Sequence, residues 1–181
     1  MTGFVLDNSV AMRWHLESGK ASDHKYAEAV LLSLADADVL VPNLGHLEAT
    51  NVLVGAEKRG DTTTIEVERF IAQLESLPIN VDPSTAKHAF SRTLSLSRAY
   101  KLSSYDAAYL ELAIREGLPL ATLEKNLLKA AKKADEEHVK AKAAEVKASE
   151  EEKKENAALK KANQEMEEYA WTYRPEMCAK A

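Results

Sequence analysis

Short apolar segments alternate along the first 120 residues with longer segments whose apolar positions recur every three or four residues. The short runs predict buried strands at FVLD (4–7), DVLVPN (38–43), INVDP (79–83) and LPLATL (118–123). The periodic segments predict helices over residues 9–16, 24–37, 44–60, 62–77, 84–100 and 103–117. Strands that alternate with amphipathic helices are typical of a parallel sheet covered on both faces, so the pattern predicts an α/β fold.

The composition changes sharply near residue 130. All six glycines lie before Leu120, whereas residues 131–168 contain neither glycine nor proline and consist mainly of alanine, lysine and glutamate. We therefore predict a globular domain over residues 1–130 and a charged, helical extension over 131–181. The apolar positions of this extension are too few for a coiled coil, so it is interpreted as a solvated helix or a partly disordered segment.

Charge and cysteine content narrow the class of protein. The formal net charge of -5 excludes nucleic-acid binding that is driven by a global basic field, although a local groove could still be basic. The single cysteine, Cys178, allows no intramolecular disulfide, which fits a reducing compartment. The first residues do not resemble a signal peptide, and no apolar run reaches the roughly 20 residues that span a bilayer. We therefore expect a cytoplasmic protein with no membrane partner.

Four acidic residues fall at the predicted strand ends or helix starts. Asp7 follows the first strand, Glu48 and Asp106 lie in the first turns of two helices, and Glu124 follows the last strand. In a parallel α/β sheet, functional groups gather at the carboxyl edge. Carboxylates crowded there repel one another unless a cation neutralises them, and Mg²⁺ or Mn²⁺ prefers such oxygen ligands. The four acids therefore form a candidate metal-dependent catalytic site.

Each acid also has a structural interpretation. Asp7 could cap the following helix, and Glu48 could be a solvated residue on a helix face. The spacing from Ser103 to Asp106 fits a helix-capping signature, and Glu124 could favour a helix N-terminus through the dipole. The five histidines show no spacing typical of metal ligands. Only the equivalent placement of all four acids favours a functional site.

Three motifs resemble those of the PIN-domain family and, within it, the VapC-like ribonuclease toxins. They are FVLDNSVAMRWHL (4–16), VPNLGHLEATNVL (41–53) and LSSYDAAYLELAIREGLPLATLEKNL (102–127). The resemblance implies a compact three-layer α/β/α domain with a central parallel sheet. It also implies hydrolysis of RNA by an acidic Mg²⁺ or Mn²⁺ site, with Asp7, Glu48 and Asp106 as metal ligands and catalytic acids.

The resemblance also assigns supporting residues. Glu124 occupies a place where the family usually has aspartate, so its reach to a second metal differs. The supporting polar residues expected around the acids are Ser9, Asn51, Ser103 and Ser104. The implied function is that of a type II toxin, with RNA as substrate, a cognate antitoxin as partner and a homodimer as the assembly. The alternative is a non-catalytic PIN-like module that binds RNA or protein.

The end of the chain departs from this family. Tyr169, Trp171, Tyr173 and Arg174 concentrate residues that often anchor protein contacts. These aromatic residues could pack on the surface of the domain. Because VapB-like antitoxins insert a helix and an arginine into the toxin groove, the alternative is that this end plugs the acidic groove of the same or a neighbouring chain.

Overall fold

The computed structural model describes residues 2–137, 140 and 153–161, and it divides the chain into two units, Met1–Ala134 and Asp135–Ala181. Residues 153–161 of the second unit are helical. The aromatic end over residues 169–174 and its proposed plug lie outside the described residues. The predicted domain limits, 1–130 and 131–181, stay predictions.

The first unit alternates strands and helices as the hydrophobic pattern predicts. The strands are β1 (Thr2–Leu6), β2 (Ala37–Pro42), β3 (Ile79–Asp82) and β4 (Leu120–Ala121). The α-helices are α1 (Asn8–Ala11), α2 (Ala21–Ser33), α3 (Gly45–Arg59), α4 (Thr64–Ser76), α5 (Thr85–His88), α6 (Leu94–Tyr100) and α7 (Ser104–Glu116). Short 3-10 turns follow α1 and α2 at Met12–Trp14 and Leu34–Asp36, and residues 125–137 are helical.

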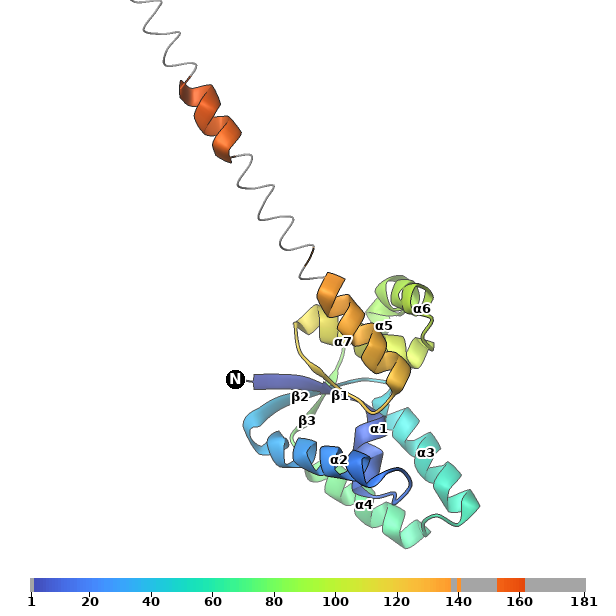
Figure 1. The fold of residues 1–181 in the computed structure, drawn as a ribbon. Coiled ribbons are helices and arrows are strands. Elements are labelled where there is room, and N and C mark those ends of the chain that lie inside the picture. The colour runs from blue at the N-terminus through green and yellow to red at the C-terminus, as the bar shows by residue number, and fades with distance from the viewer. Residues whose placement is uncertain (1, 138–139, 141–152, 162–181) are drawn as a thin grey trace, which may run out of the picture. The chain divides into compact units, whose positions relative to one another are not determined.

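The four strands form one parallel sheet in the order β3-β2-β1-β4 (Figure 1). Its register pairs Val5 with Leu40 and with Leu120, so β1 lies inside the sheet between β2 and β4. All strands run the same way, and their carboxyl ends therefore meet at one edge. The residues that follow β1 and β4, and the starts of α3 and α7, lie along this edge.

Helices cover both faces of the sheet, on opposite sides in Figure 1. On one face, Leu6 and Val39 pack with buried side chains of α1, α2, α3 and α4. On the other face, Val5 packs with α7 and with the helical residues that follow β4, including Leu127. Because successive side chains of a strand point to opposite faces, neighbouring residues of β1 serve the two cores. The α/β prediction, with a central parallel sheet between helices, is confirmed.

Most elements differ from their predicted extents by a few residues, and two differ in a way that has a structural cause. The helix predicted over residues 84–100 is interrupted by a π-helical segment, Ala89–Thr93, for which apolar periodicity gives no signal. The strand predicted over 118–123 is reduced to Leu120–Ala121. The carbonyl of Pro119 accepts from the amide of Val5 at 2.9 Å, but Pro119 has no amide proton to continue the ladder. Thr122 turns its side chain toward Asp7 instead.

Candidate functional site

Asp7 lies at the carboxyl end of β1, where its carboxylate is buried. The side chain is 5% exposed. Its Oδ2 accepts a short hydrogen bond from the Ser9 hydroxyl and another from Thr122 Oγ1 at 2.7 Å. Burial raises the pKa of Asp7 above its ordinary range; these hydrogen bonds oppose that effect, and the nearby charge of Asp106 adds to it. Asp7 occupies the N-cap position of α1, but its side chain makes no capping hydrogen bond to that helix, so the alternative interpretation as a cap is not supported.

Glu48 lies in the first turn of α3 and is half-buried. Its Oε2 accepts a hydrogen bond from the Tyr109 hydroxyl at 2.7 Å and a longer one from Asn8 Nδ2 at 3.5 Å. Burial raises the pKa of Glu48, the bond from Tyr109 lowers it, and the negative charge of Asp7 raises it again. Glu48 is therefore a partly desolvated carboxylate close to a second one.

Asp106 lies in the first turn of α7, where it takes part in the helix cap. Its backbone amide donates to the Ser103 hydroxyl oxygen at 3.0 Å, and the same hydroxyl donates to Asp106 Oδ2 at 2.8 Å. The predicted helix cap at Ser103 is therefore confirmed. The charge of Asp106 also acts on both Asp7 and Glu48, raising the pKa of each.

Three acids from three elements thus lie within electrostatic reach of one another. They supply only oxygen donors, which is the chemistry that Mg²⁺ and Mn²⁺ prefer. In the part of the chain that the structure describes, no three His, Cys, Asp or Glu side chains converge closely enough to hold one metal ion. Oδ2 of Asp106 accepts a hydrogen bond from the Ser103 hydroxyl, and Oε2 of Glu48 accepts one from the Tyr109 hydroxyl. Each of these oxygens is therefore held in place by a neighbouring side chain. The carboxylate oxygens of Asp7, Glu48 and Asp106 fit a hard cation in their chemistry, but each side chain is held by different hydrogen-bond partners.

Of the other predicted site residues, some contact the three acids and others are exposed without such a contact. Ser9 contacts Asp7 directly and also accepts the backbone amide of Leu123 at 2.9 Å. Asn51 and Ser104 are exposed, and neither makes a side-chain hydrogen bond to residues 2–137. Glu124 is exposed, and its carboxylate makes no hydrogen bond or ion pair with those residues. The catalytic and metal-binding assignments stay predictions.

Three residues that contact Asp7 or Glu48 were not predicted from the sequence: Asn8, Tyr109 and Thr122. The sequence pattern of the amphipathic helix places Tyr109 in the core, and its side chain is 1% exposed. A buried tyrosine hydroxyl needs a hydrogen-bond partner, and that requirement is the signal that could have identified it. Burial and the charge of Glu48 raise the pKa of Tyr109, so that its phenol stays protonated and donates to Glu48.

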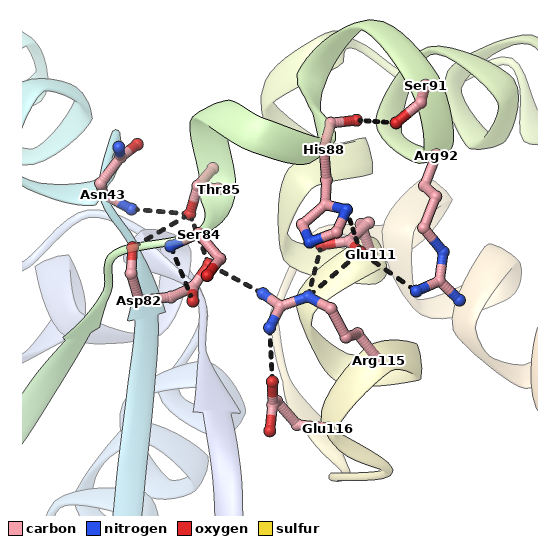
Figure 2. Close-up of polar contacts among 10 residues, drawn as sticks. All are labelled: Asn43, Asp82, Ser84, Thr85, His88, Ser91, Arg92, Glu111, Arg115 and Glu116. Carbon is pink, nitrogen blue, oxygen red and sulfur yellow. Dashed lines mark hydrogen bonds and ion pairs between the residues drawn. The ribbon is translucent and has the colours of Figure 1, made fainter.

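A second charged network anchors α7, the helix that carries Asp106 and Tyr109. Figure 2 shows Arg115 between two buried acids. Its guanidinium donates to both carboxylate oxygens of Glu111, at 3.2 and 3.3 Å, and to Oδ2 of Asp82 at 2.8 Å. Asp82 also accepts from the Thr85 hydroxyl at 2.8 Å. The network therefore ties the second half of α7 to the end of β3 and the start of α5.

Comparison with known proteins agrees with this architecture. The model of the PIN domain family matches residues 4–133. Among solved structures, the chain is similar to the crystal structure of PAE2754 from Pyrobaculum aerophilum. The TM-score is 0.51 and the identity 21%, over 72% of this chain and 87% of that one. At this identity the likeness concerns the fold alone.

No curated protein matches the chain significantly. Within residues 2–137, 140 and 153–161, the helices are too short or too polar to cross a membrane.

Proposed function

Because this chain belongs to the PIN-domain family, whose members are generally nucleases, we propose that it is a Mg²⁺- or Mn²⁺-dependent endoribonuclease. The observation that carries the proposal is that Asp7, Glu48 and Asp106, just after β1 and in the first turns of α3 and α7, lie within electrostatic reach of one another. The charge of Asp106 raises the pKa of Asp7 and of Glu48, and the charge of Asp7 also raises that of Glu48. Such a cluster is costly without a neutralising cation. Asp7, Glu48 and Asp106 would hold the ion.

The chain's own residues prepare this site for a phosphodiester. The hydroxyls of Ser9 and Thr122 fix one oxygen of Asp7, and Ser103 orients Asp106. A bound Mg²⁺ or Mn²⁺ would supply Lewis-acid polarisation of the scissile phosphate. Glu48 would serve as a further ligand or as a base. The exposed carboxylate of Glu124 lies in solvent, and its contribution would come through water.

The narrower assignment that we propose is the toxin of a type II toxin–antitoxin system, acting in the cytoplasm as a homodimer. The motifs around Asp7, Glu48 and Asp106 support it by their resemblance to VapC-like toxins. An apolar pocket of about 430 Å³ adjoins the site and shares Asn8 and Gly45 with it. This pocket supports the proposal of a protein partner, the cognate antitoxin, beside the RNA substrate.

The test measures cleavage of single-stranded RNA by the full chain with Mn²⁺, alongside two variants. Asp7→Asn and Asp106→Asn should abolish cleavage while the circular dichroism spectrum stays unchanged. Asp61→Asn is the matched control, because Asp61 is an exposed acid paired with Arg59 at 2.8 Å and follows the far end of α3. Full cleavage by both site variants would refute the nuclease proposal. Growth arrest by the wild type, but not by Asp7→Asn, would support the toxin assignment.

A second candidate is a non-catalytic PIN-like module that binds RNA or protein. One observation favours it: among the described residues, no three acidic or histidine side chains converge on a single metal position. The same assay separates the two candidates. A binding module would retain RNA in a gel-shift experiment but leave it uncut at every Mn²⁺ concentration.

A further inference from the structure

The hydroxyl of Tyr109 lies where α1, α3 and α7 meet. It donates to Oε2 of Glu48 at 2.7 Å and accepts from Nδ2 of Asn8 at 3.0 Å. The same Nδ2 donates to the backbone carbonyl of Gly45 at 2.7 Å. The two protons of the Asn8 amide are thus used by the first residue of α3 and by the phenol. One hydroxyl therefore links α7 to a carboxylate of α3 and to an amide of α1.

Packing alone does not explain why residue 109 is tyrosine, because its hydroxyl has no role in the apolar core. The ring lies in the apolar cluster around Leu110 and Leu112, where phenylalanine would fill the same space. At Gly45, a Cβ would approach the phenol oxygen to 3.3 Å, tighter than ordinary van der Waals contact. Glycine at this position therefore makes room for the hydroxyl. The position of the phenol oxygen therefore accounts for tyrosine at residue 109 and for glycine at residue 45.

These bonds act on only one of the two oxygens of Glu48. Tyr109 donates to Oε2 and Asn8 Nδ2 lies 3.5 Å from the same oxygen, whereas Oε1 accepts no hydrogen bond from the described residues. A carboxylate held by one oxygen has a restricted plane and keeps the other oxygen as a ligand. Hydrogen bonds to a metal-binding carboxylate restrict it in this way, and their loss typically weakens metal binding 10- to 100-fold.

We infer that Tyr109 is a positioning residue, which together with Asn8 holds Glu48 in the conformation that binds the divalent cation. The inference rests on the proposed function, because it assumes that Glu48 faces a cation. Tyr109 contacts neither RNA nor the ion in this arrangement, and it acts through Glu48. The same helix thus contributes Asp106 as a ligand and, one turn later, the group that orients a second ligand.

The test compares Tyr109→Phe with Tyr105→Phe in the full chain. Tyr105 lies on the same helix, is 58% exposed, and serves as the matched control. Mn²⁺ binding is measured by isothermal titration calorimetry without RNA, and cleavage is measured as kcat and KM. We expect Tyr109→Phe to bind Mn²⁺ roughly 10- to 100-fold more weakly and to lose kcat, with KM for RNA unchanged. Tyr105→Phe should match the wild type in both measurements.

The outcomes separate the inference from the function on which it rests. Wild-type affinity for Mn²⁺ in a folded Tyr109→Phe variant would overturn the inference and leave the nuclease proposal intact. A wild type that binds no Mn²⁺ and cleaves no RNA would overturn both. If Tyr109→Phe does not fold, the comparison uses Asn8→Ala, since Asn8 lies outside the apolar clusters. Weaker Mn²⁺ binding by this variant supports the inference, and unchanged binding overturns it.

Discussion

Replacing Asp7 by asparagine should stabilise the metal-free protein at neutral pH. The Asp7 carboxylate is 5% exposed and lies near the charges of Glu48 and Asp106. Asparagine has nearly the same shape and keeps an acceptor for the hydroxyls of Ser9 and Thr122. The substitution therefore removes the cost of a desolvated, repelled charge but retains weaker, neutral hydrogen bonds.

The size and the pH dependence of this effect follow from the raised pKa of Asp7. The ordinary value is 3.8, and burial raises it in the folded state. A raised carboxyl pKa contributes stability that is fully present below the unfolded value and is lost as pH rises through the folded value. The advantage of Asp7→Asn therefore grows as pH rises above the ordinary value of 3.8 and levels off once pH has passed the raised pKa of the folded state. We expect about 0.5–2 kcal/mol, the gain that a single stabilising substitution commonly gives.

Thermal unfolding in EDTA at several pH values measures this effect, because 1 kcal/mol shifts the Tm of a chain of this size by about 2–4 °C. Mn²⁺ should reverse the order of the two proteins. At 100 times its dissociation constant, the ion would stabilise the wild type by about 2.7 kcal/mol, and the variant by much less. A variant that is less stable than the wild type at pH 7 in EDTA would refute the reasoning.

Two further predictions concern the framework of the site. Arg115→Met leaves the buried carboxylates of Asp82 and Glu111 without their shared cation, so the free energy of unfolding should fall by about 3–5 kcal/mol in urea denaturation. A loss below 1 kcal/mol would contradict the importance of this network. Leu127→Ala removes a side chain that is 0% exposed and should cost about 2–5 kcal/mol, while Leu128→Ala, 40% exposed, should cost far less. Equal losses would contradict the packing described here.

The helix α7 shows why much of the fold could be predicted. Its start is encoded locally by the Ser103 hydroxyl, which accepts the amide of Asp106, and its end by Gly117, which adopts a left-handed conformation with φ of 66°. The apolar positions between them set the buried face. Such signals lie within a few residues of the structure that they specify, so they can be recognised in a single sequence.

The site was predictable only in part, because its contacts join residues far apart in the chain. Asp7 was identified as a strand-end acid, but its partner Thr122 lies 115 residues away, and a threonine after a strand carries no special signal. Asn8 and Tyr109 likewise depend on where α1 and α7 meet. Asn51, which was predicted from the motif, is exposed, and Asn8 contacts Glu48 instead.

The concentration of functions on α7 has a consequence for recombining this domain with its relatives. Within thirteen residues, this helix carries Asp106, Tyr109, Glu111 and Arg115. Tyr109 contacts Glu48 of α3, and Arg115 joins Glu111 to Asp82 of β3. The successive spacings of the four helix residues, three, two and four positions, fix their directions around the helix axis, at about 100° per residue. A crossover or a one-residue insertion inside α7 would rotate one half of these groups away from their partners. Residues 103–117 are therefore best exchanged as one block, together with the regions of β3 and α3 that they contact.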